Sequence, residues 1–586
     1  MFAENINFCS ELEGGDCGQG ERLVYAVNLL MSEVYSIMWL QNYNPLGSIG
    51  LSALVAAIPL FILLYMLGVK RSKGHNAAFF GVLSAVLIAI FIFKMPAGLA
   101  ISATLNGALV GIFPIVWIVV TAIWVYNMTV ESGEFEIIKN SLASITDDRR
   151  LQALFIAFAF GSFIEGTAGF GTPVAITAAM LVGLGFNPVY AAGICLIANT
   201  APVAFGAIGI PIVVAGQVTG IDPMAISKVV GRQLPFLSVI VPLWLVVLMC
   251  GWKRSTEVLP AVIVAGLCFA VTQFYTSNYV SVYLPDITSA FVTIIGLLVF
   301  LKFWKPSQIW HFPDEKPSLG VTKSEYSTGE ILRAWAPYLI LAVLVFLWAD
   351  DRFIGFKKVL VGWEKTLGLT PVLWPGLHNL ILKAAPVVAK NTPYAATYGI
   401  NFLSAAGTAI FFSGLLSIFI MPNYSFGKAF TCFFRTIKQL VFPIATIAMI
   451  LGLAYIMNYS GMSSTLGLAF TATGALFPFF SPLLGWMGVF LTGSDTSSNA
   501  LFGSMQKTAA EQLSIDPNLT VAANSSGGVC GKMISPQSIS VACAATGLVG
   551  QESTIFRFAL PHSIAMVIFM GVLTYLQAYV LGWMLP

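Results

Sequence analysis

The chain has 586 residues, of which 57% are hydrophobic and 9% are charged, and its net charge is +3. Ordinary globular domains carry about 25% charged residues, so this composition predicts a multi-pass membrane protein rather than several soluble domains. The small net charge, with no basic run, excludes nucleic-acid binding, and we expect no nucleic acid among the partners.

Residues 1–45 form a polar N-terminal extension that is acidic at first. This extension lacks the basic start and the cleavage site of a signal peptide. Met38 begins M-W-L-Q-N-Y-N-P, a sequence typical of an alternative start. We therefore expect the first 37 residues to be dispensable.

Apolar segments follow along the rest of the chain, and most have the roughly 20 residues that a helix needs to cross a bilayer. They occupy 46–68, 77–94, 105–130, 151–185, 188–218, 233–250, 258–275, 285–302, 331–349, 402–421, 438–458, 463–480, 484–503, 519–548 and 562–584. The segment 151–185 is too long and too rich in glycine for one helix. We predict an all-α polytopic membrane protein with about 12–14 transmembrane helices.

Lysine and arginine gather in short loops, a pattern typical of cytoplasmic loops. The basic clusters lie at 70–73, 253–254, 302–323 and 428–438. Placing all four in the cytoplasm puts the N-terminus outside, provided that 151–185 enters the membrane and returns on the same side. The long loop 350–400, which also carries lysines, then lies outside.

Two parts of the chain resemble each other in four places and in the same order. The matched pairs are Phe113-Pro114-Ile115 (with Tyr126) and Phe442-Pro443-Ile444 (with Tyr455), 161–167 and 488–494, Asn199/Gly206/Pro211 and Asn524/Gly531/Pro536, and Leu234-Pro235 and Leu560-Pro561. The expected topology runs the two parts in opposite directions. We predict inverted repeats at 105–254 and 437–586, the usual plan of secondary transporters, with leading helices at 46–104 and connecting helices and loops at 255–436.

Each repeat offers a re-entrant hairpin followed by a broken helix. The predicted breaks lie within 198–211 and 523–536, where proline and clustered glycine interrupt the helical hydrogen bonds. Freed helix N-termini favour an anion. Short polar side chains stand at these breaks: Asn199, Thr200, Asn524, Ser525 and Ser526. Such residues also serve simply to join helices, but the repeated spacing favours a binding site.

The second hairpin, T-G-S-D-T-S-S-N-A at 492–500, has five hydroxyl residues, Asp495 and Asn499 within nine positions. Its candidate binding residues are Ser494, Thr496, Ser498 and Asn499. A solvated surface loop is the alternative interpretation. Apolar segments close on both sides of the stretch, which favours a position within the membrane.

Three full charges fall in the repeat cores, at Glu165, Asp495 and Lys532. Removal from water favours the protonated form of a carboxylate, so Glu165 or Asp495 could couple proton movement to substrate movement. Lys532 could be the counter-ion of a substrate carboxylate, or it could pair with Asp495. Both interpretations of Lys532 stay open at this point.

Enzyme and cofactor motifs are not found in the sequence. The four histidines have no metal-ligand spacing, there is no G-x-S-x-G elbow, and Met533 stands where a phosphate loop requires Ser or Thr. We expect neither an enzyme nor a cofactor or metal site.

The chain resembles the lactate permease family of bacterial inner membranes. The resemblance covers nearly everything from Met38 to Pro586, through the motifs W-L-Q-N-Y-N-P at 39–45, F-I-E-G-T-A-G-F-G-T-P-V-A-I-T-A-A at 163–179, N-T-A-P-V-A-F-G-A-I-G-I-P at 199–211, V-F-L-T-G-S-D-T-S-S-N-A-L-F at 489–502 and G-K-M-I-S-P-Q-S at 531–538. It implies uptake of L-lactate, with D-lactate and glycolate also accepted, by proton symport. Thr167 stands where the family usually has a smaller residue, which implies a slightly altered pocket. The paired hairpins are also similar, more distantly, to those of divalent-anion/sodium symporters.

We therefore predict a proton-coupled symporter of 2-hydroxymonocarboxylates. The substrate carboxylate would lie on the half-helix N-termini at 199–206 and 524–531, and its hydroxyl would bind Asn, Ser or Thr of the hairpins. Glu165 is the first candidate for the coupling proton and Asp495 the second. The alternatives are a sodium-coupled dicarboxylate carrier and, from other classes, an intramembrane enzyme or a passive channel. The sequence leaves monomer and homodimer open.

Overall fold

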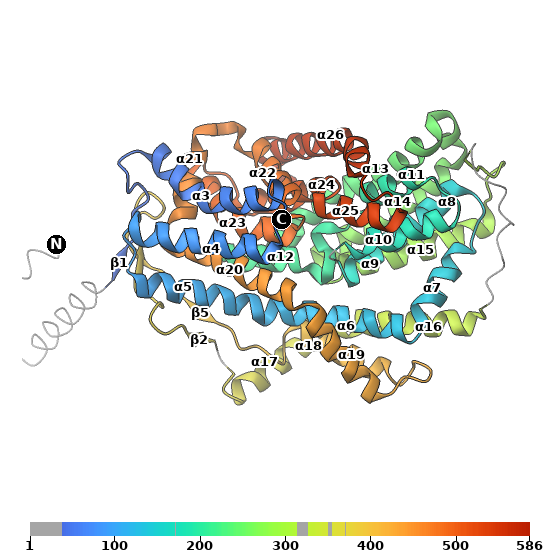
Figure 1. Ribbon diagram of the computed structural model, residues 1–586, viewed down its shortest axis with the longest axis horizontal. Coiled ribbons are helices and arrows are strands. Elements are labelled where there is room, and N and C mark those ends of the chain that lie inside the picture. Colours follow the sequence, from blue (N-terminus) through green and yellow to red (C-terminus); the bar gives the residue numbers. More distant parts are fainter. Residues whose placement is uncertain (1–37, 170, 313–325, 350–353, 370) are drawn as a thin grey trace, which may run out of the picture.

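The computed structural model describes residues 38–169, 171–312, 326–349, 354–369 and 371–586. Most of these residues are helical (Figure 1). The predicted dispensability of residues 1–37 and part of the basic cluster at 302–323 lie outside the described residues.

Within the described part of the chain, nine helical runs are long and apolar enough to cross a membrane, or ten if one bent pair counts as a span. The elements that form these runs are α3 (Ile49–Gly68), α4 (Gly74–Phe91), α5 (Ala97–Val110), η1 (Gly111–Val116), α6 (Trp117–Glu131), α13 (Pro223–Ser255), η4 (Thr256–Val258), α14 (Leu259–Tyr275), η5 (Thr276–Val280), α15 (Pro285–Phe303), α16 (Thr328–Ala349), α20 (Val441–Ser460), α21 (Met462–Phe470), η6 (Thr471–Leu476), α22 (Phe477–Thr492) and α26 (Glu552–Tyr579). This arrangement confirms an all-α polytopic membrane protein.

The span count is lower than the 12–14 expected because some expected spans are short or merge with a neighbour. The shorter helices are α7 (Glu134–Ala143), α8 (Arg149–Ala153), η2 (Leu154–Phe160), α9 (Gly161–Thr167), α10 (Thr172–Gly183), α11 (Pro188–Ala198), η3 (Val203–Phe205), α12 (Gly206–Thr219), α17 (Phe356–Thr366), α18 (Ala406–Ser417), α19 (Phe426–Gln439), α24 (Pro517–Lys532), α25 (Pro536–Thr546) and η7 (Gly582–Met584), and α23 (Asp495–Gln512) is longer but polar. α13 and α14 form one run despite a kink at Gly251, whose φ is +74°.

Among the described residues, five short strands lie outside the long helices. They are β1 (Trp39–Leu40), β2 (Val372–Leu373), β3 (Ile381–Lys383), β4 (Thr392–Pro393) and β5 (Thr397–Tyr398). β1 pairs in parallel with β3, which pairs antiparallel with β4, and β2 pairs antiparallel with β5. The W-L-Q-N-Y-N-P motif thus joins the loop 371–398 to one end of the helical bundle (Figure 1).

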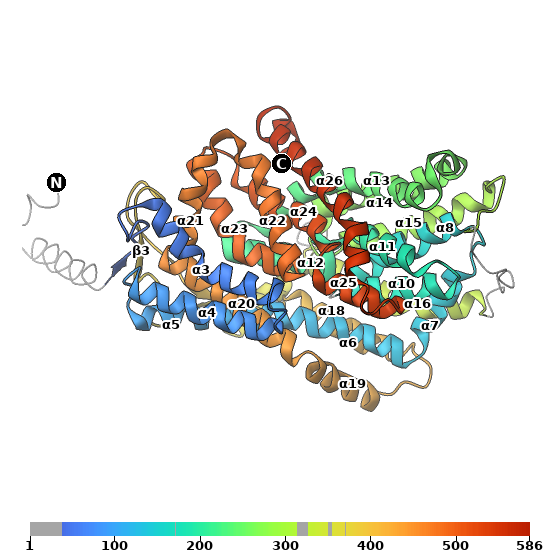
Figure 2. The ribbon, with the colours of Figure 1, turned by 45° about the horizontal axis from the view of Figure 1, so that its top comes forward.

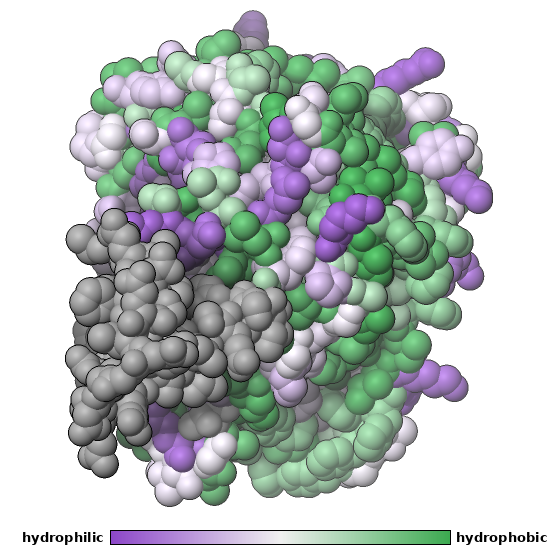
Figure 3. Space-filling model, turned by 90° about the vertical axis from the view of Figure 1, so that its left-hand side faces the viewer, coloured by the Kyte–Doolittle hydropathy of each residue, from purple (hydrophilic) through white to green (hydrophobic). Residues whose placement is uncertain are grey.

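The long helices pack side by side and leave apolar side chains on the outer surface. α20 packs against α4 and α5, and α22 packs against α24 and α26 (Figure 2). Large exposed hydrophobic side chains include Leu54, Phe61, Phe91 and Leu105. Much of the surface seen from the β1 end is hydrophobic, with scattered polar residues (Figure 3). Such a surface is stable in contact with lipid, whereas in water the hydrophobic effect would cause exposed apolar surfaces to associate.

The elements follow the same order in the two predicted repeats. A hairpin, α9–α10, precedes the broken helix α11–α12, and a second hairpin, α22–α23, precedes α24 and α25. The inverted relation between the two repeats stays a prediction.

Candidate functional site

A cavity of about 910 Å³ lies between the two hairpins. Its wall contains the three charged residues singled out in the sequence, Glu165, Asp495 and Lys532. The first turns of three helices also line it, namely α12 at Gly206, α23 at 495–497 and α25 at 536–540. A volume of this size is typical of small-molecule sites.

Glu165 lies in the last turn of α9 and is 4% exposed. Its side chain passes directly over Gly206, because a Cβ there would be 2.6 Å from the Glu165 Oε1. Only glycine permits this approach. The Oε2 atom of Glu165 is buried without a hydrogen-bond partner among the described residues, and the Lys532 ammonium acts on the carboxyl through its charge.

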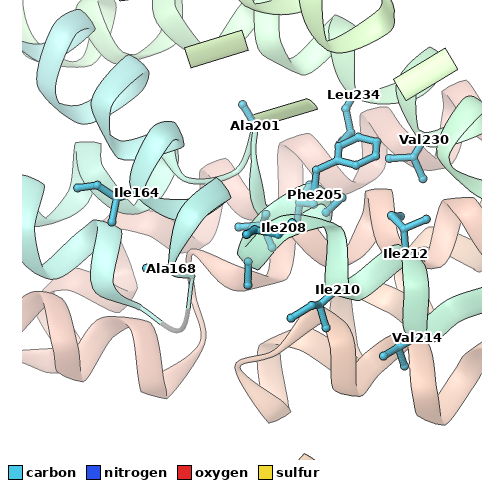
Figure 4. Packing of buried hydrophobic residues seen from close by; sticks show 14 of the residues in the cluster. Ile164, Ala168, Ala201, Phe205, Ile208, Ile210, Ile212, Val214, Val230 and Leu234 are labelled. Atoms are coloured by element: carbon cyan, nitrogen blue, oxygen red, sulfur yellow. The ribbon is translucent and has the colours of Figure 1, made fainter. Parts of the chain in front are cut away.

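The broken helix of the first repeat forms as predicted. α11 and the η3–α12 segment meet at an angle of 63°. Ala207 and Ile208 have φ values of 45° and 58°, a left-handed conformation that is strained for a β-branched residue such as Ile208. Ala168, which follows α9, lies near Ile208 in this segment (Figure 4). The first hairpin therefore packs directly on the break.

Asp495 is the first residue of α23 and is 3% exposed. Its Oδ2 accepts hydrogen bonds from the Ser525 hydroxyl and, at 3.4 Å, from the Asn499 amide. Gly528 leaves room for the other oxygen, since a Cβ there would lie 2.2 Å from Oδ1. The carboxyl is thus held at a helix N-terminus, where negative charge is favoured.

A buried polar network lies behind Asp495. Asn524 donates to Asn499 at 2.7 Å, and Gln506 donates to Asn524 at 2.7 Å. Ser481 is hydrogen-bonded to Gln506. Asn499 also donates to the carbonyl of Pro211 in α12 at 3.1 Å. The network therefore connects the second hairpin to the broken helix of the first repeat.

The ammonium of Lys532 donates to the carbonyl of Gly493 at 2.7 Å. Gly493 is the residue at which α22 ends, and a Cβ there would lie 2.3 Å from the Gln537 Oε1. The ion pairs among the described residues do not join Lys532 to Asp495. Lys532 therefore fixes the hairpin turn rather than forming the structural pair with Asp495.

The break in the second repeat falls at the far end of the predicted range 523–536. Asn524, Ser525 and Ser526 are in the middle of the continuous helix α24, and the interruption falls at 533–535, before Pro536 starts α25. Proline disfavours helical geometry in the residue before it, whereas glycine and serine are tolerated inside a packed helix. The expected helix N-terminus at 524–531 is therefore wrong, and the freed N-terminus belongs to α25.

The structure separates the predicted site residues into two groups. Those that line the cavity are Glu165, Ser494, Asp495, Thr496 and Lys532. Those that lie buried outside its lining are Thr167, Asn199, Thr200, Ser498, Asn499, Asn524, Ser525 and Ser526. The Thr167 hydroxyl bonds to the Phe163 carbonyl of its own helix. Several members of the second group position the first through hydrogen bonds.

Three further polar residues belong to the same region and were not predicted. Gln506 joins the buried network, Gln537 lines the cavity, and Asp286 lies beside Glu165. Asp286 begins an apolar segment, where a charge usually marks the membrane boundary. Gln506 stands in a polar stretch without a distinguishing pattern, whereas Gln537 lies in the motif 531–538, which carries the family resemblance but assigned this residue no role.

The far end of α12 is closed by hydrogen bonds to the second repeat. Asn458 and Ser504 donate to the carbonyl of Val218 at 2.9 and 2.6 Å, and Lys507 donates to the carbonyl of Thr219 at 2.8 Å. These donors satisfy the last carbonyls of the helix, and the lysine suits the negative end of its dipole.

The fold and the cavity define a polytopic membrane transporter. The chain belongs to the L-lactate permease family, whose model matches residues 52–581. It is 53% identical over 567 residues to the glycolate permease GlcA of Escherichia coli, covering 94% of this chain and 100% of that protein. L-lactate permeases of Salmonella typhimurium and Bacillus subtilis are 50% and 48% identical, over 94% of this chain and 100% of each relative. The protein is thus a multi-pass integral protein of the bacterial inner membrane.

Proposed function

We propose that the protein takes up L-lactate, and also D-lactate and glycolate, by proton symport. The observation that carries this proposal is the cavity wall, where two buried carboxyls, Glu165 and Asp495, stand beside one ammonium, Lys532. The relatives named as L-lactate and glycolate permeases support the substrate class.

The charges at the cavity wall give a physical reason for coupling the binding of a proton to the binding of the substrate. With Glu165 and Asp495 ionised and Lys532 charged, these three side chains together carry one net negative charge and disfavour a carboxylate beside them. Protonation of either acid removes that charge, so a proton and an anionic substrate each strengthen the binding of the other. The Lys532 ammonium and the first turns of α23 and α25 then favour the substrate carboxylate.

The cavity mouth lies beside the basic cluster at 70–73, since Arg71 and Lys73 line it. The positive-inside pattern assigns this cluster to the cytoplasm. We therefore assign the structure to a state open to the cytoplasm and closed at the far end of α12, where Asn458, Ser504 and Lys507 bind the helix end.

Uptake by proteoliposomes under an imposed pH gradient tests the proposal. We expect labelled L-lactate to accumulate without sodium, to saturate with concentration, and to leak out on addition of a protonophore. Glycolate and D-lactate should compete, and succinate should not. A requirement for sodium would replace proton symport by the sodium-coupled alternative, and flux that neither saturates nor accumulates would indicate a channel.

A further inference from the structure

A third buried carboxyl lies next to the cavity without lining it. Asp286 is in the first turn of α15 and is 1% exposed. Neither of its carboxyl oxygens has a hydrogen-bond partner among the described residues. An acidic residue in a first helical turn often caps the helix, but this carboxyl accepts no backbone N–H, so capping does not explain its burial.

The backbone of α9 is shaped to bring Asp286 close to the cavity. A Cβ at Gly166 would lie 2.8 Å from the Cβ of Asp286 and 3.1 Å from Cγ1 of Ile287, so only glycine allows α9 and α15 to approach this closely. The residue before this glycine is Glu165, and the two carboxyls interact electrostatically. Asp286 therefore packs against α9 at the residue next to Glu165, outside the lining of the cavity.

Each of the two helices, α9 and α15, also carries a buried serine close to its carboxyl residue. Ser162 is one turn from Glu165 on α9, and Ser289 is one turn from Asp286 on α15. The hydroxyls of both are buried and find no partner within the part of the chain that the structure describes. Buried polar groups are otherwise almost always hydrogen-bonded, and such clusters typically hold water or exchange protons.

The two carboxyls cannot both be charged at low cost. Ionising neighbouring acids away from water buries two like charges, so one of them holds a proton. Glu165 has the Lys532 ammonium nearby as a counter-charge, whereas Asp286 has Glu165 as its acidic neighbour. The proton therefore resides on Asp286 when Glu165 is ionised.

Few other ionisable groups face this pair. α15 packs against α9, α14, α12, η2 and η5, and its Phe291 ring meets Trp335 of α16. Glu165 is the acidic group on these elements that acts on Asp286. The remaining ionisable side chains of α15 and of these elements are Lys302, Cys268, Tyr275, Tyr279, Glu330, Arg333 and Tyr338. Of these, Arg333 pairs with Glu134, and Tyr338 is bonded to Thr129.

We propose that Asp286 is a proton-relay residue that exchanges a proton with Glu165 along a path lined by Ser162 and Ser289. In the transfer, the O–H bond of the Asp286 carboxyl breaks and an O–H bond forms on the Glu165 carboxylate, directly or through one water. The negative charge moves to Asp286, a hydronium ion reprotonates Asp286 and leaves water, and Glu165 releases its proton to water in the cavity. This inference rests on the proposed proton symport.

The experiment compares two modes of transport by the same purified protein in proteoliposomes. Net uptake driven by a pH gradient requires the coupling proton to leave the carrier and another proton to bind in each cycle. Exchange of labelled for unlabelled lactate does not require this step. We expect Asp286→Asn to exchange lactate at close to the wild-type rate and to lose net uptake on the order of 100-fold, as for groups that transfer protons. Ser289→Ala should slow net uptake with exchange intact.

The matched control is Thr293→Val, one turn further along α15, where the buried hydroxyl is already bonded to the Ser289 carbonyl. It should leave both modes unchanged. Wild-type net uptake by Asp286→Asn would overturn the relay, and so would equal loss of exchange and net uptake in this variant. If the wild-type protein itself shows no uptake driven by the pH gradient, the proposed symport fails, which is a separate result.

Discussion

The ammonium of Lys532, at the end of α24, donates a 2.7 Å hydrogen bond to the carbonyl of Gly493, at the end of α22. This bond holds the turn of the second hairpin against the neighbouring helix and keeps a positive charge at the cavity wall. The same ammonium interacts electrostatically with both Glu165 and Asp495. One side chain therefore links the hairpin turn, the two acids and the space in which we place the substrate.

Replacement of Lys532 by Gln should weaken lactate binding while leaving the protein folded. A hydrogen bond to a charged group contributes roughly 1.5–3 kcal/mol, which is about 10- to 100-fold in affinity. The KM for lactate in uptake assays measures the effect, and Lys532→Arg should retain much of the affinity. The control is Lys438→Gln, at an exposed lysine away from the cavity. An unchanged KM in Lys532→Gln would remove the lysine from the site.

Replacement of Glu165 by Gln should uncouple lactate movement from proton movement. The amide has nearly the same shape over Gly206 but cannot carry a proton across, so exchange should persist while lactate-driven alkalinisation of the medium disappears. A pH electrode in a lightly buffered cell suspension measures this. Full alkalinisation by this variant would rule out Glu165 as the coupling residue and favour Asp495.

Replacement of Gly527 by Ala should destabilise the packing of α24 on α22. A Cβ at this position would lie 2.0 Å from the carbonyl oxygen of Pro482, so the two helices must move apart. Overpacking of this kind costs roughly 1–3 kcal/mol. The melting temperature of the detergent-solubilised protein should fall. Gly183→Ala, in open space at the end of α10, is the control and should leave it unchanged or slightly higher.

A cysteine placed at Ser540 should react from the cytoplasmic side. Ser540 is an exposed residue of α25 that lines the cavity. A membrane-impermeant thiol reagent should label Ser540→Cys in inside-out vesicles, and lactate should slow the labelling. Thr397→Cys, exposed on β5, should instead react in right-side-out vesicles. The protein without an added cysteine provides the background, and the reverse pattern would invert the proposed orientation.

The amino-acid sequence by itself determined the membrane class, the family resemblance and three of the charged residues that line the cavity, Glu165, Asp495 and Lys532. The composition indicates the membrane class directly, because lipid requires long apolar helices regardless of how they pack. A charged residue within such a helix is rare and is therefore easy to recognise in the sequence. The first broken helix was equally visible, since the crowded glycines and Pro211 cannot continue a regular helix.

Only the tertiary structure decided which polar residues share the site. Asn524 appeared to stand at a helix break, but helix packing keeps α24 continuous and moves the interruption to 533–535. Asp286, at the start of an apolar segment, was not singled out in the sequence, yet the close approach of α15 to Gly166 buries it beside Glu165. Contacts between helices distant in the chain depend on how side chains fit at a few crossing points, and a single sequence carries no periodic signal for that fit.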